Sequence, residues 1–396
     1  MPYLGDLRRT RRCAEQVPDR EPIVAWRDVL PGFGSHCPSG GRESGIVVLP
    51  DRVAWSSMNG TVRCLALSDG RELWRYDAGG PVVTSGDADD NLIVICSNAV
   101  FDERTHTWVL NTSVETNTPD AGGVVHALDH DGTLRWQHEN PEGARFPSLS
   151  GDTVYYHTPY GLAAYSADGT RHWMDTEGNL AVAPPALDVA AGIGVSAEDF
   201  EGHHIHGGLR VTDLATGQPL WAVDGSKQNF NPDPPVVAFG SVWMIGFVFR
   251  EHDRTAVRLN RFDLRSGRLL ATVPLGTEIE SFATCLAADE TGILVSYQGG
   301  RGMNDGVKHI RADNGKPRLI QPIPADAAAV TGGRALLATT TQLCAVDVAS
   351  GEQLWSLENP QNAAVTTWDR VVTVVPTAHG VLWQAGPTVT MLRSDR

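Results

Sequence analysis

Residues 209–221 read LRVTDLATGQPLW, and residues 343–355 read LCAVDVASGEQLW. Each phrase contains a strand-like run of alternating residues, a polar turn that ends in glycine, and a tryptophan four residues after that glycine. Glycine tolerates the positive φ that a tight hairpin requires. The phrase recurs at residues 62–74, 124–136, 162–173, 259–271 and 307–319, with Ala271 and Leu319 replacing tryptophan in the last two. Such internal repetition indicates a repeat architecture.

The spacing of these phrases predicts a β-propeller. Successive tryptophan positions lie 36 to 62 residues apart, and a blade of four short strands with tight connections needs about 35 to 50 residues. A single blade cannot bury its own faces, so blades must stack around an axis. We expect each tryptophan to lie on the outermost strand of its blade and to pack its ring against the neighbouring blade.

The two ends of the chain together predict one further blade. About 40 residues follow Trp355, enough for three strands but not for a fourth. Residues 23–30 (IVAWRDVL) place Trp26 in a phrase like the other outer strands, with no strands of its own before it. We therefore expect an all-β, eight-bladed propeller of four-stranded antiparallel blades, in which residues 23–30 complete the last blade and leave no free edge. A seven-bladed ring with a separate C-terminal tail is the alternative.

In domain terms, this prediction makes residues 1–22 an N-terminal extension, residues 23–392 one propeller domain and residues 393–396 a tail. The formal net charge of −15 repels phosphate backbones and anionic lipid, so we expect neither nucleic acid nor a membrane as partner. The basic residues at positions 8, 9, 11 and 12 precede no apolar segment of the kind that export signals carry, so we expect a cytoplasmic protein.

The repeated phrase, of the general form ALDxxTGxxxW, resembles the PQQ-type propeller repeat. Quinoprotein alcohol dehydrogenases, the outer-membrane assembly propeller lipoprotein and sensor domains of some bacterial kinases share that repeat. The resemblance extends over residues 23–392 and implies the fold, because the repeated residues are turn glycines and packing tryptophans. Redox members of the family also carry a vicinal Cys-Cys pair and carboxylate and amide ligands for calcium. This sequence has no adjacent cysteines and no CxxCH motif, so we expect no PQQ cofactor.

One face of the predicted ring carries the long connections. If the strands of a blade are labelled A to D from the axis outwards, the glycine turn joins C to D, and the B–C and D–A connections lie on the opposite face. Predicted B–C connections occupy residues 97–123, 197–208, 249–256 and 298–306. Insertions on a rigid scaffold concentrate where binding occurs. Seven of the thirteen histidines fall in predicted B–C connections, namely His106, His157, His203, His204, His206, His252 and His379.

The segment EDFEGHHIHGG at residues 198–208 is the strongest candidate site. His204 and His206 share one face if the segment is extended, and Asp199 and Glu201 have the chemistry to orient an imidazole or to ligate a metal. Histidine titrates near neutrality and is the commonest metal ligand. We take these four residues as candidate catalytic residues, with the two histidines as ligands if a metal binds. A solvated hairpin loop without any ligand is the alternative interpretation, and no zinc motif such as HExxH is present.

Further candidates lie on the same predicted face. His157 and His252 complete the set of candidate catalytic residues. Tyr160 has an aromatic ring that suits an apolar ligand. The candidate substrate-binding residues are Arg145, Tyr160, Asn229, Arg301 and His106.

Two functions remain open at this point. The first is a module that binds a small molecule or a protein on the B–C and D–A face. The alternative is a cofactor-independent enzyme of the isomerase, cyclase or lyase type, with histidines and carboxylates at the mouth of the central channel. Convergence of these side chains around a pocket favours the enzyme, and a broad apolar patch favours the binding module.

Overall fold

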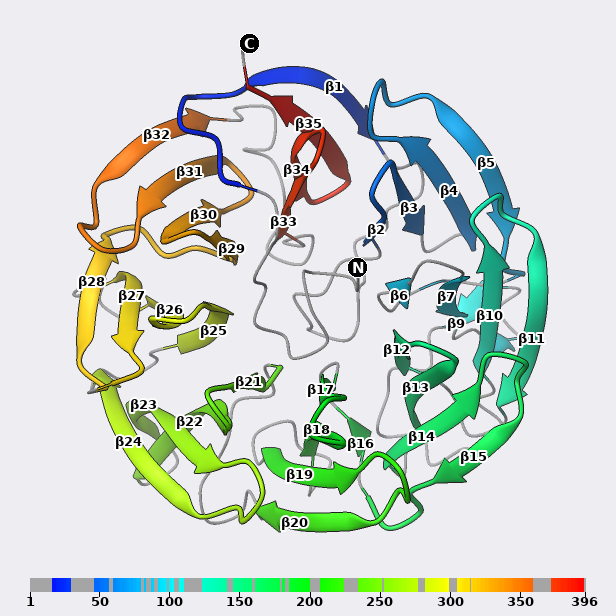
Figure 1. Ribbon diagram of the computed structural model, residues 1–396, viewed down its shortest axis with the longest axis horizontal. Coiled ribbons are helices and arrows are strands. Elements are labelled where there is room, and N and C mark those ends of the chain that lie inside the picture. The colour runs from blue at the N-terminus through cyan, green and yellow to red at the C-terminus, as the bar shows by residue number, and fades with distance from the viewer. Residues whose placement is uncertain are drawn as a thin grey trace.

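The structure is a computed structural model. It describes residues 16–29, 46–56, 60–79, 82, 87–88, 92–97, 100–102, 107–109, 123–140, 145–158, 161–178, 180–181, 185–199, 207–223, 234–250, 253–276, 282–298, 305–313, 315–358 and 372–394. In these residues the regular structure consists of strands, and none of them forms a helix that is long and apolar enough to cross a membrane. The strands form eight antiparallel blades around a central axis (Figure 1). The expected eight-bladed propeller is confirmed, and the seven-bladed alternative is wrong.

The first four blades each run outward from the axis in the order A to D. Blade one contains β2 (Ile46–Val48), β3 (Arg52–Ser56), β4 (Thr61–Ala66) and β5 (Glu72–Asp77). Blade two contains β6 (Asp87–Ala88), β7 (Leu92–Ser97), β10 (Gly123–Asp129) and β11 (Leu134–Asn140), with the hairpin of β8 (Val100–Asp102) and β9 (Thr107–Val109) inserted between β7 and β10. Blade three contains β12 (Arg145–Ser150), β13 (Thr153–Thr158), β14 (Gly161–Ser166) and β15 (Arg171–Met174). In blade four, β16 (Leu180–Ala181) and β17 (Ala186–Asp188) both pair with β18 (Ile193–Asp199), followed by β19 (Gly207–Asp213) and β20 (Pro219–Val223).

The other four blades repeat this order. Blade five contains β21 (Val236–Ala238), β22 (Ser241–Arg250), β23 (Asp253–Asp263) and β24 (Leu269–Gly276). Blade six contains β25 (Phe282–Ala288), β26 (Gly292–Gln298), β27 (Gly306–Arg311) and β28 (Pro317–Gln321), and blade seven β29 (Ala327–Thr331), β30 (Arg334–Ala338), β31 (Gln342–Asp347) and β32 (Gln353–Glu358). Blade eight contains β33 (Val372–Thr377), β34 (Gly380–Ala385), β35 (Thr388–Arg393) and β1 (Ile23–Val29).

Strand β1 closes the ring, as the sequence predicts. It lies beside β35 (Figure 1) and pairs with it antiparallel, with Trp26 opposite Met391. Asp28 on the same strand makes a 2.8 Å ion pair with Arg63 of β4, and Arg63 also contacts Glu72 at 2.7 Å. The first described strand of the chain therefore joins blade eight to blade one.

The tryptophans of the repeat pack across the blade boundaries. The Trp173 indole lies over Gly217 of the next blade, so closely that a Cβ atom on this glycine would be 2.6 Å from the ring. The Trp173 indole N–H donates a 3.0 Å hydrogen bond to the Leu214 carbonyl in the same turn. Equivalent ring–glycine and hydrogen-bond contacts are made by Trp26 on Gly70 and Leu67, Trp74 on Gly132 and His130, and Trp221 on Gly267 and Leu264. The glycine is required at these positions for its positive φ and for its missing side chain.

The N-terminal arm, residues 16–22 before β1, supplies the hydrogen-bond acceptor that a C–D turn supplies in other blades. The indole of Trp355 in blade seven has no C–D turn to face, because the third and fourth strands of blade eight come from opposite ends of the chain. The carbonyl of Pro18 accepts its N–H bond instead, at 2.8 Å. Val17 is buried in the core cluster that contains Trp355, and Asp19 forms an ion pair with Arg334. The arm thus replaces the missing turn.

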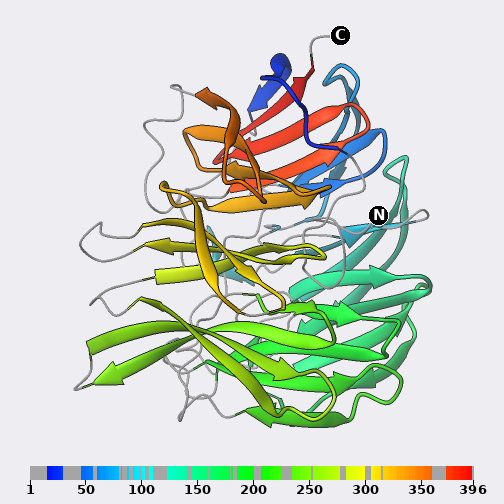
Figure 2. The ribbon, with the colours of Figure 1, turned by 60° about the vertical axis from the view of Figure 1, so that its left-hand side comes forward.

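The two faces of the ring differ as the sequence predicts. The A–B and C–D turns lie on one face, which we call the turn face, and none is longer than the five residues 67–71 between β4 and β5. The B–C and D–A connections begin and end on the other face, which we call the connection face (Figure 2). The longest of them comprise residues 30–45, 98–122, 224–235 and 359–371.

Two details of the predicted connections are wrong. Strand β22 extends to Arg250 and β23 begins at Asp253, so two residues rather than the stretch 249–256 join them. His379 lies between β33 and β34, the first and second strands of blade eight. This A–B turn is on the turn face. The outer strand of blade eight comes from the N-terminus, so β33, β34 and β35 are its strands A, B and C.

Candidate functional site

Three of the eleven candidate residues from the sequence fall within the described chain. His157 is described with its side chain, and Arg145 and Asp199 are described by their backbone. Arg145 is the first residue of β12 and lies opposite His157, and Asp199 is the last residue of β18. All three lie at or next to the end of a strand, on the side of the ring that forms the connection face. The other candidates lie outside the described residues: His204, His206, Glu201, His252, Tyr160, Asn229, Arg301 and His106.

The side chain of His157 lies inside the propeller, within β13 instead of in a connection. It is fully buried, and its Nε2 atom is 3.2 Å from the hydroxyl oxygen of Ser196 on β18. Side chains alternate along a strand, so His157 shares with Tyr155 the side of blade three that faces blade four. The histidine–serine contact therefore crosses a blade boundary.

A buried ionic network continues from this contact. Glu198 lies two residues after Ser196 on the same side of β18, and Arg210 is opposite Ser196 on β19. The Nε atom of Arg210 is 3.1 Å from one Glu198 carboxylate oxygen, and its Nη1 atom is 3.5 Å from a carboxylate oxygen of Asp175. Arg210 Nη2 also donates a 2.8 Å hydrogen bond to the Glu177 carbonyl. We call His157, Ser196, Glu198, Arg210 and Asp175 the blade 3–4 network.

The backbone holds Asp175 in this place. Asp175 follows the outer strand β15, and its N–H donates a 2.9 Å hydrogen bond to the Leu162 carbonyl. Gly161 leaves the space that the carboxylate occupies, since a Cβ on Gly161 would lie 3.0 Å from the Asp175 side chain. The network thus joins the outer strand of blade three to the second and third strands of blade four.

The chemistry of the blade 3–4 network follows from its burial. Its five residues are each less than one-tenth exposed. One guanidinium serves two carboxylates, and guanidinium is the cation best suited to a buried pair because of its fork of donors. An imidazole–hydroxyl pair beside carboxylates has the composition of an acid–base site, but the burial keeps its described atoms from solvent. The geometry therefore suits a network that fixes strand ends beneath the connection face.

We expect the change Arg210→Met to lower the free energy of unfolding by about 3–5 kcal/mol. The substitution leaves Glu198 and Asp175 buried without their counter-charge, and breaking a buried pair costs this much. Denaturant unfolding measures the effect. The matched control is Arg135→Met, whose 2.6 Å ion pair with Asp129 is at the surface with the arginine side chain 62% exposed, so its loss should lower the free energy of unfolding far less. Equal losses in the two variants would contradict the assigned role of the network.

Another buried histidine crosses the boundary between blades one and two. His126 on β10 is 3% exposed, and its Nδ1 atom is 3.0 Å from the hydroxyl oxygen of Tyr76 on β5. Burial lowers the pKa of His126 from its ordinary 6.5 to about 4. Burial also lowers the pKa of His309, which contacts the Thr291 hydroxyl at 3.1 Å. Both imidazoles are therefore neutral at neutral pH.

Acidification should weaken the fold through His126. The unfolded chain binds a proton below pH 6.5, whereas the folded chain does so only near pH 4. Above pH 6.5 the titration of His126 therefore leaves the free energy of unfolding unchanged. As the pH falls from 6.5 towards 4, that free energy decreases by about 1.4 kcal/mol per pH unit and by about 3 kcal/mol in all. Denaturant unfolding between pH 7 and pH 4.5 measures this slope. The variant His126→Gln should show a shallower slope than the parent, and parallel curves would contradict the assignment.

The described residues also bear on metal and thiol chemistry. They contain no group of three or more His, Cys, Asp or Glu placed to hold a metal ion. Cys64, Cys96 and Cys344 are buried free thiols, and burial raises the pKa of Cys64 to about 12. A thiol with such a pKa is not a nucleophile at neutral pH.

Sequence reasoning missed most of the blade 3–4 network. Ser196 and Glu198 follow one another on one side of the strand segment IGVSAED, and Arg210 interrupts GLRVTD. A signal was present, because ionisable residues at core-facing positions of an alternating strand require buried partners. The partner across the blade boundary could not be named without the three-dimensional arrangement.

Comparisons with known proteins agree with this architecture. A family model described as outer membrane protein assembly factor BamB matches residues 24–176, 115–247 and 255–393. The crystal structure of BamB from Moraxella catarrhalis is 16% identical, with a TM-score of 0.60 and coverage of 95% of this chain and 98% of that one. The quinohemoprotein alcohol dehydrogenase from Comamonas testosteroni is 11% identical, with a TM-score of 0.63 and coverage of 99% and 80%. At these identities the structures share the fold, and no curated protein sequence matches the chain.

Proposed function

Because the chain belongs to the PQQ-type propeller family whose model is described as outer membrane protein assembly factor BamB, we propose that it is a binding module whose partner is a protein. The partner docks on the connection face. The observation that carries this proposal is the asymmetry of the ring: short turns cover one face, and every long connection begins and ends on the other. Loops on a rigid scaffold are the usual place of binding residues.

The scaffold beneath the connection face is suited to this role. The blade 3–4 network fixes the ends of β13, β18 and β19 at this face through contacts of 2.8 to 3.5 Å. Fixed loop bases reduce the ordering cost of binding. The connections that depart from this region carry His204 and His206, candidate catalytic residues from the sequence, and Asn229, a candidate substrate-binding residue.

Site-specific photo-crosslinking tests which face binds. A photoreactive amino acid replaces Tyr160, Asn229 or Arg301, in connections that begin and end on the connection face, and Asp152, Thr216 or Ser350 in turns of the turn face. We expect a protein adduct, identified by mass spectrometry, at the first set and none at the second. The purified partner should then bind with a Kd that rises at least about tenfold, 1.4 kcal/mol, when Asn229 and Arg301 are both changed to glutamate.

Two outcomes would refute the proposal. Adducts confined to the turn face would place the partner on the wrong side of the ring. Native mass spectrometry that shows a stoichiometric small molecule, released by changes at the connection face, would identify a small-molecule site there instead of a protein-docking site.

A further inference from the structure

Blades five and six depart together from the repeat. The outer strands of most blades carry a tryptophan that covers the turn of the next blade, but β24 and β28 have Ala271 and Leu319 there. At the boundary of blades six and seven, the Arg318 guanidinium donates to the carbonyls of Val348 and Ala349, the turn that a tryptophan N–H reaches in other blades. The blade boundary thus remains closed without an indole.

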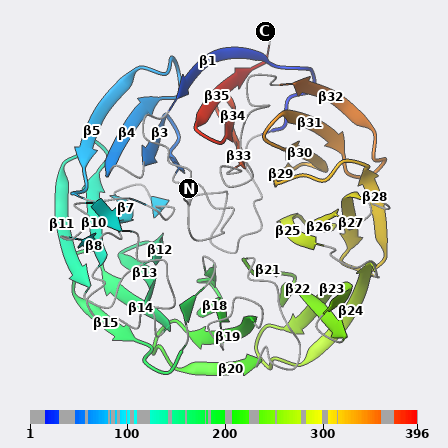
Figure 3. The same ribbon diagram turned by 180° about the vertical axis from the view of Figure 1, so that it is seen from behind.

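The same two strands expose aliphatic side chains. Leu269 and Leu270 on β24 are 44% and 39% exposed, and Leu319 on β28 is 49% exposed. Strands β24 and β28 follow one another along the rim of the ring in both axial views (Figures 1 and 3). Three exposed leucines therefore lie along one sector of the rim. We call Leu269, Leu270 and Leu319, with Arg265, Arg268 and Lys316 of the C–D turns that precede them, the rim strip.

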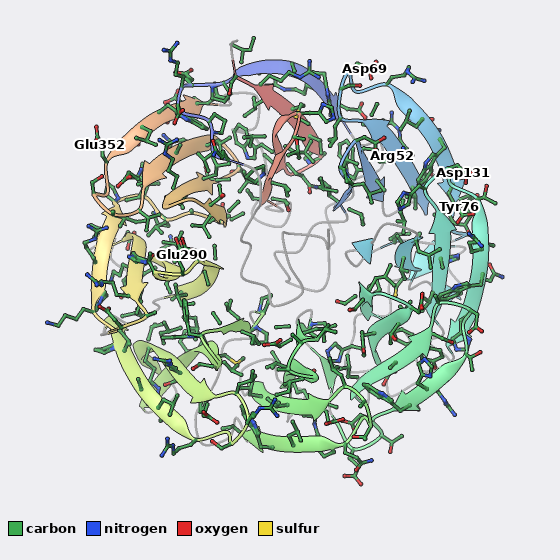
Figure 4. All side chains as sticks on the ribbon, viewed as in Figure 1. Arg52, Asp69, Tyr76, Asp131, Glu290 and Glu352 are labelled. Atoms are coloured by element: carbon green, nitrogen blue, oxygen red, sulfur yellow. The ribbon has the colours of Figure 1, made fainter. Side chains whose placement is uncertain are left out.

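The charge of this sector is opposite to that of the whole chain. The C–D turn and outer strand of blade five (264–276) contain two arginines and no carboxylate, and those of blade six (312–321) contain Lys316 and Arg318 against Asp313. In the corresponding segments of blades one, two, three, four and seven, cations never outnumber carboxylates. Figure 4 shows Asp69, Asp131 and Glu352 at the rim in blades one, two and seven. A basic sector on a chain with a net charge of −15 attracts acidic partners.

Strand β24 also offers a free edge. It is the last strand of its sheet, and its eight residues LLATVPLG contain no charge. Edge strands are usually protected by charged side chains, and an unprotected edge is a template for another extended chain. Pro274 removes one N–H near its end, so the segment available for pairing is the first part of the strand, where both leucines are exposed.

We propose that the rim strip binds an extended, acidic segment of a partner protein. Aliphatic side chains of that segment cover Leu269, Leu270 and Leu319, and its carboxylates meet Arg265, Arg268 and Lys316. This docking surface lies on the outer strands and is separate from the connection face. Its occupant follows from the chemistry of the strip, in which exposed leucines on two outer strands follow cations in the turns that precede those strands.

Fluorescence anisotropy with a labelled peptide of alternating valine and glutamate tests the proposal. We expect this peptide to bind the full chain, with an affinity that falls as the salt concentration rises. We also expect the affinity to be about tenfold lower in each of the variants Arg268→Glu and Leu319→Glu. The matched control is Leu220→Glu, because Leu220 on β20 is 44% exposed and precedes its tryptophan as Leu270 precedes Ala271. This variant should bind the peptide like the parent.

Three results would overturn the proposal. The first is equal binding of a peptide with lysine in place of glutamate. The second is unchanged affinity in Leu319→Glu and Arg268→Glu, with thermal unfolding curves that match the parent. The third is self-association in sedimentation that Leu319→Glu abolishes while the acidic peptide does not bind, since the strip would then hold a second copy of the chain. Failure of the proposed function is distinguishable, because changes at Asn229 and Arg301 should not alter binding of this peptide.

Discussion

Removal of residues 1–29 should prevent the chain from forming a closed ring. The deletion takes away β1, so β35 loses its six paired residues and becomes an open sheet edge. It also removes Trp26, which is partly buried against the core of blades one and eight, together with its 3.0 Å indole hydrogen bond to the Leu67 carbonyl in the turn of blade one. Open edges promote association between chains. We therefore expect aggregation on expression, measured as the soluble fraction and by size-exclusion chromatography.

Two shorter deletions act as controls. Removal of residues 1–15 leaves every described contact of the arm, which starts at Val17, and should leave the unfolding temperature within a few degrees of the parent. Removal of residues 1–22 keeps β1 but takes away Pro18, so the buried indole N–H of Trp355 loses its acceptor. An orphaned buried donor costs about 1–3 kcal/mol. A soluble, fully folded chain lacking residues 1–29 would refute the assigned role of β1.

The change Gly217→Ala should lower the free energy of unfolding by about 2–5 kcal/mol. Gly217 has a φ of +73°, and a Cβ there would lie 2.6 Å from the Trp173 ring. The left-handed backbone alone costs about 1–2 kcal/mol for a residue with a side chain, and displacement of a packed ring adds about 1–3 kcal/mol. Displacement should also break the indole bond to Leu214. Denaturant unfolding followed by tryptophan fluorescence measures both the stability and the altered ring environment.

Gly240→Ala provides the matched comparison. Gly240 has a similar φ of +63°, but no atom lies within 4 Å of the position its Cβ would take. This variant should lose only the backbone component, about 1–2 kcal/mol. The difference between the two variants isolates the contact between indole and turn. If both lost the same stability, the tryptophan would have no energetic part in the glycine requirement.

The architecture could be predicted from the repeat because its signals are local. A turn glycine, a strand of alternating residues and a tryptophan four residues later occur within one short phrase, such as 209–221. The closing strand was predictable for the same reason, since Trp26 lies in an outer-strand phrase. The N-terminal arm was not, because the contact between Pro18 and Trp355 joins residues 337 positions apart without any motif.

The candidate site was predicted less well. The connections rich in histidine begin and end on the expected face, but His157 proved to be a core residue of β13. A histidine next to a turn sequence is predicted to be exposed. Side chains alternate along β13, however, so Tyr155 and His157 lie on the same side of the blade and both face blade four. Ser196, which contacts His157, and Arg210, which contacts Glu198, lie on strands of another blade. Their roles depend on which blades are adjacent and in what register.

The sequence by itself determined the fold class, the strand that closes the ring and the face with the long connections, because each follows from patterns within a single repeat or from the lengths between repeats. Only the tertiary structure decided which polar side chains meet between blades, that the Pro18 carbonyl completes blade eight, and that exposed leucines and cations gather on blades five and six. Those features depend on distances between separate repeats, and stacking around an axis sets these distances.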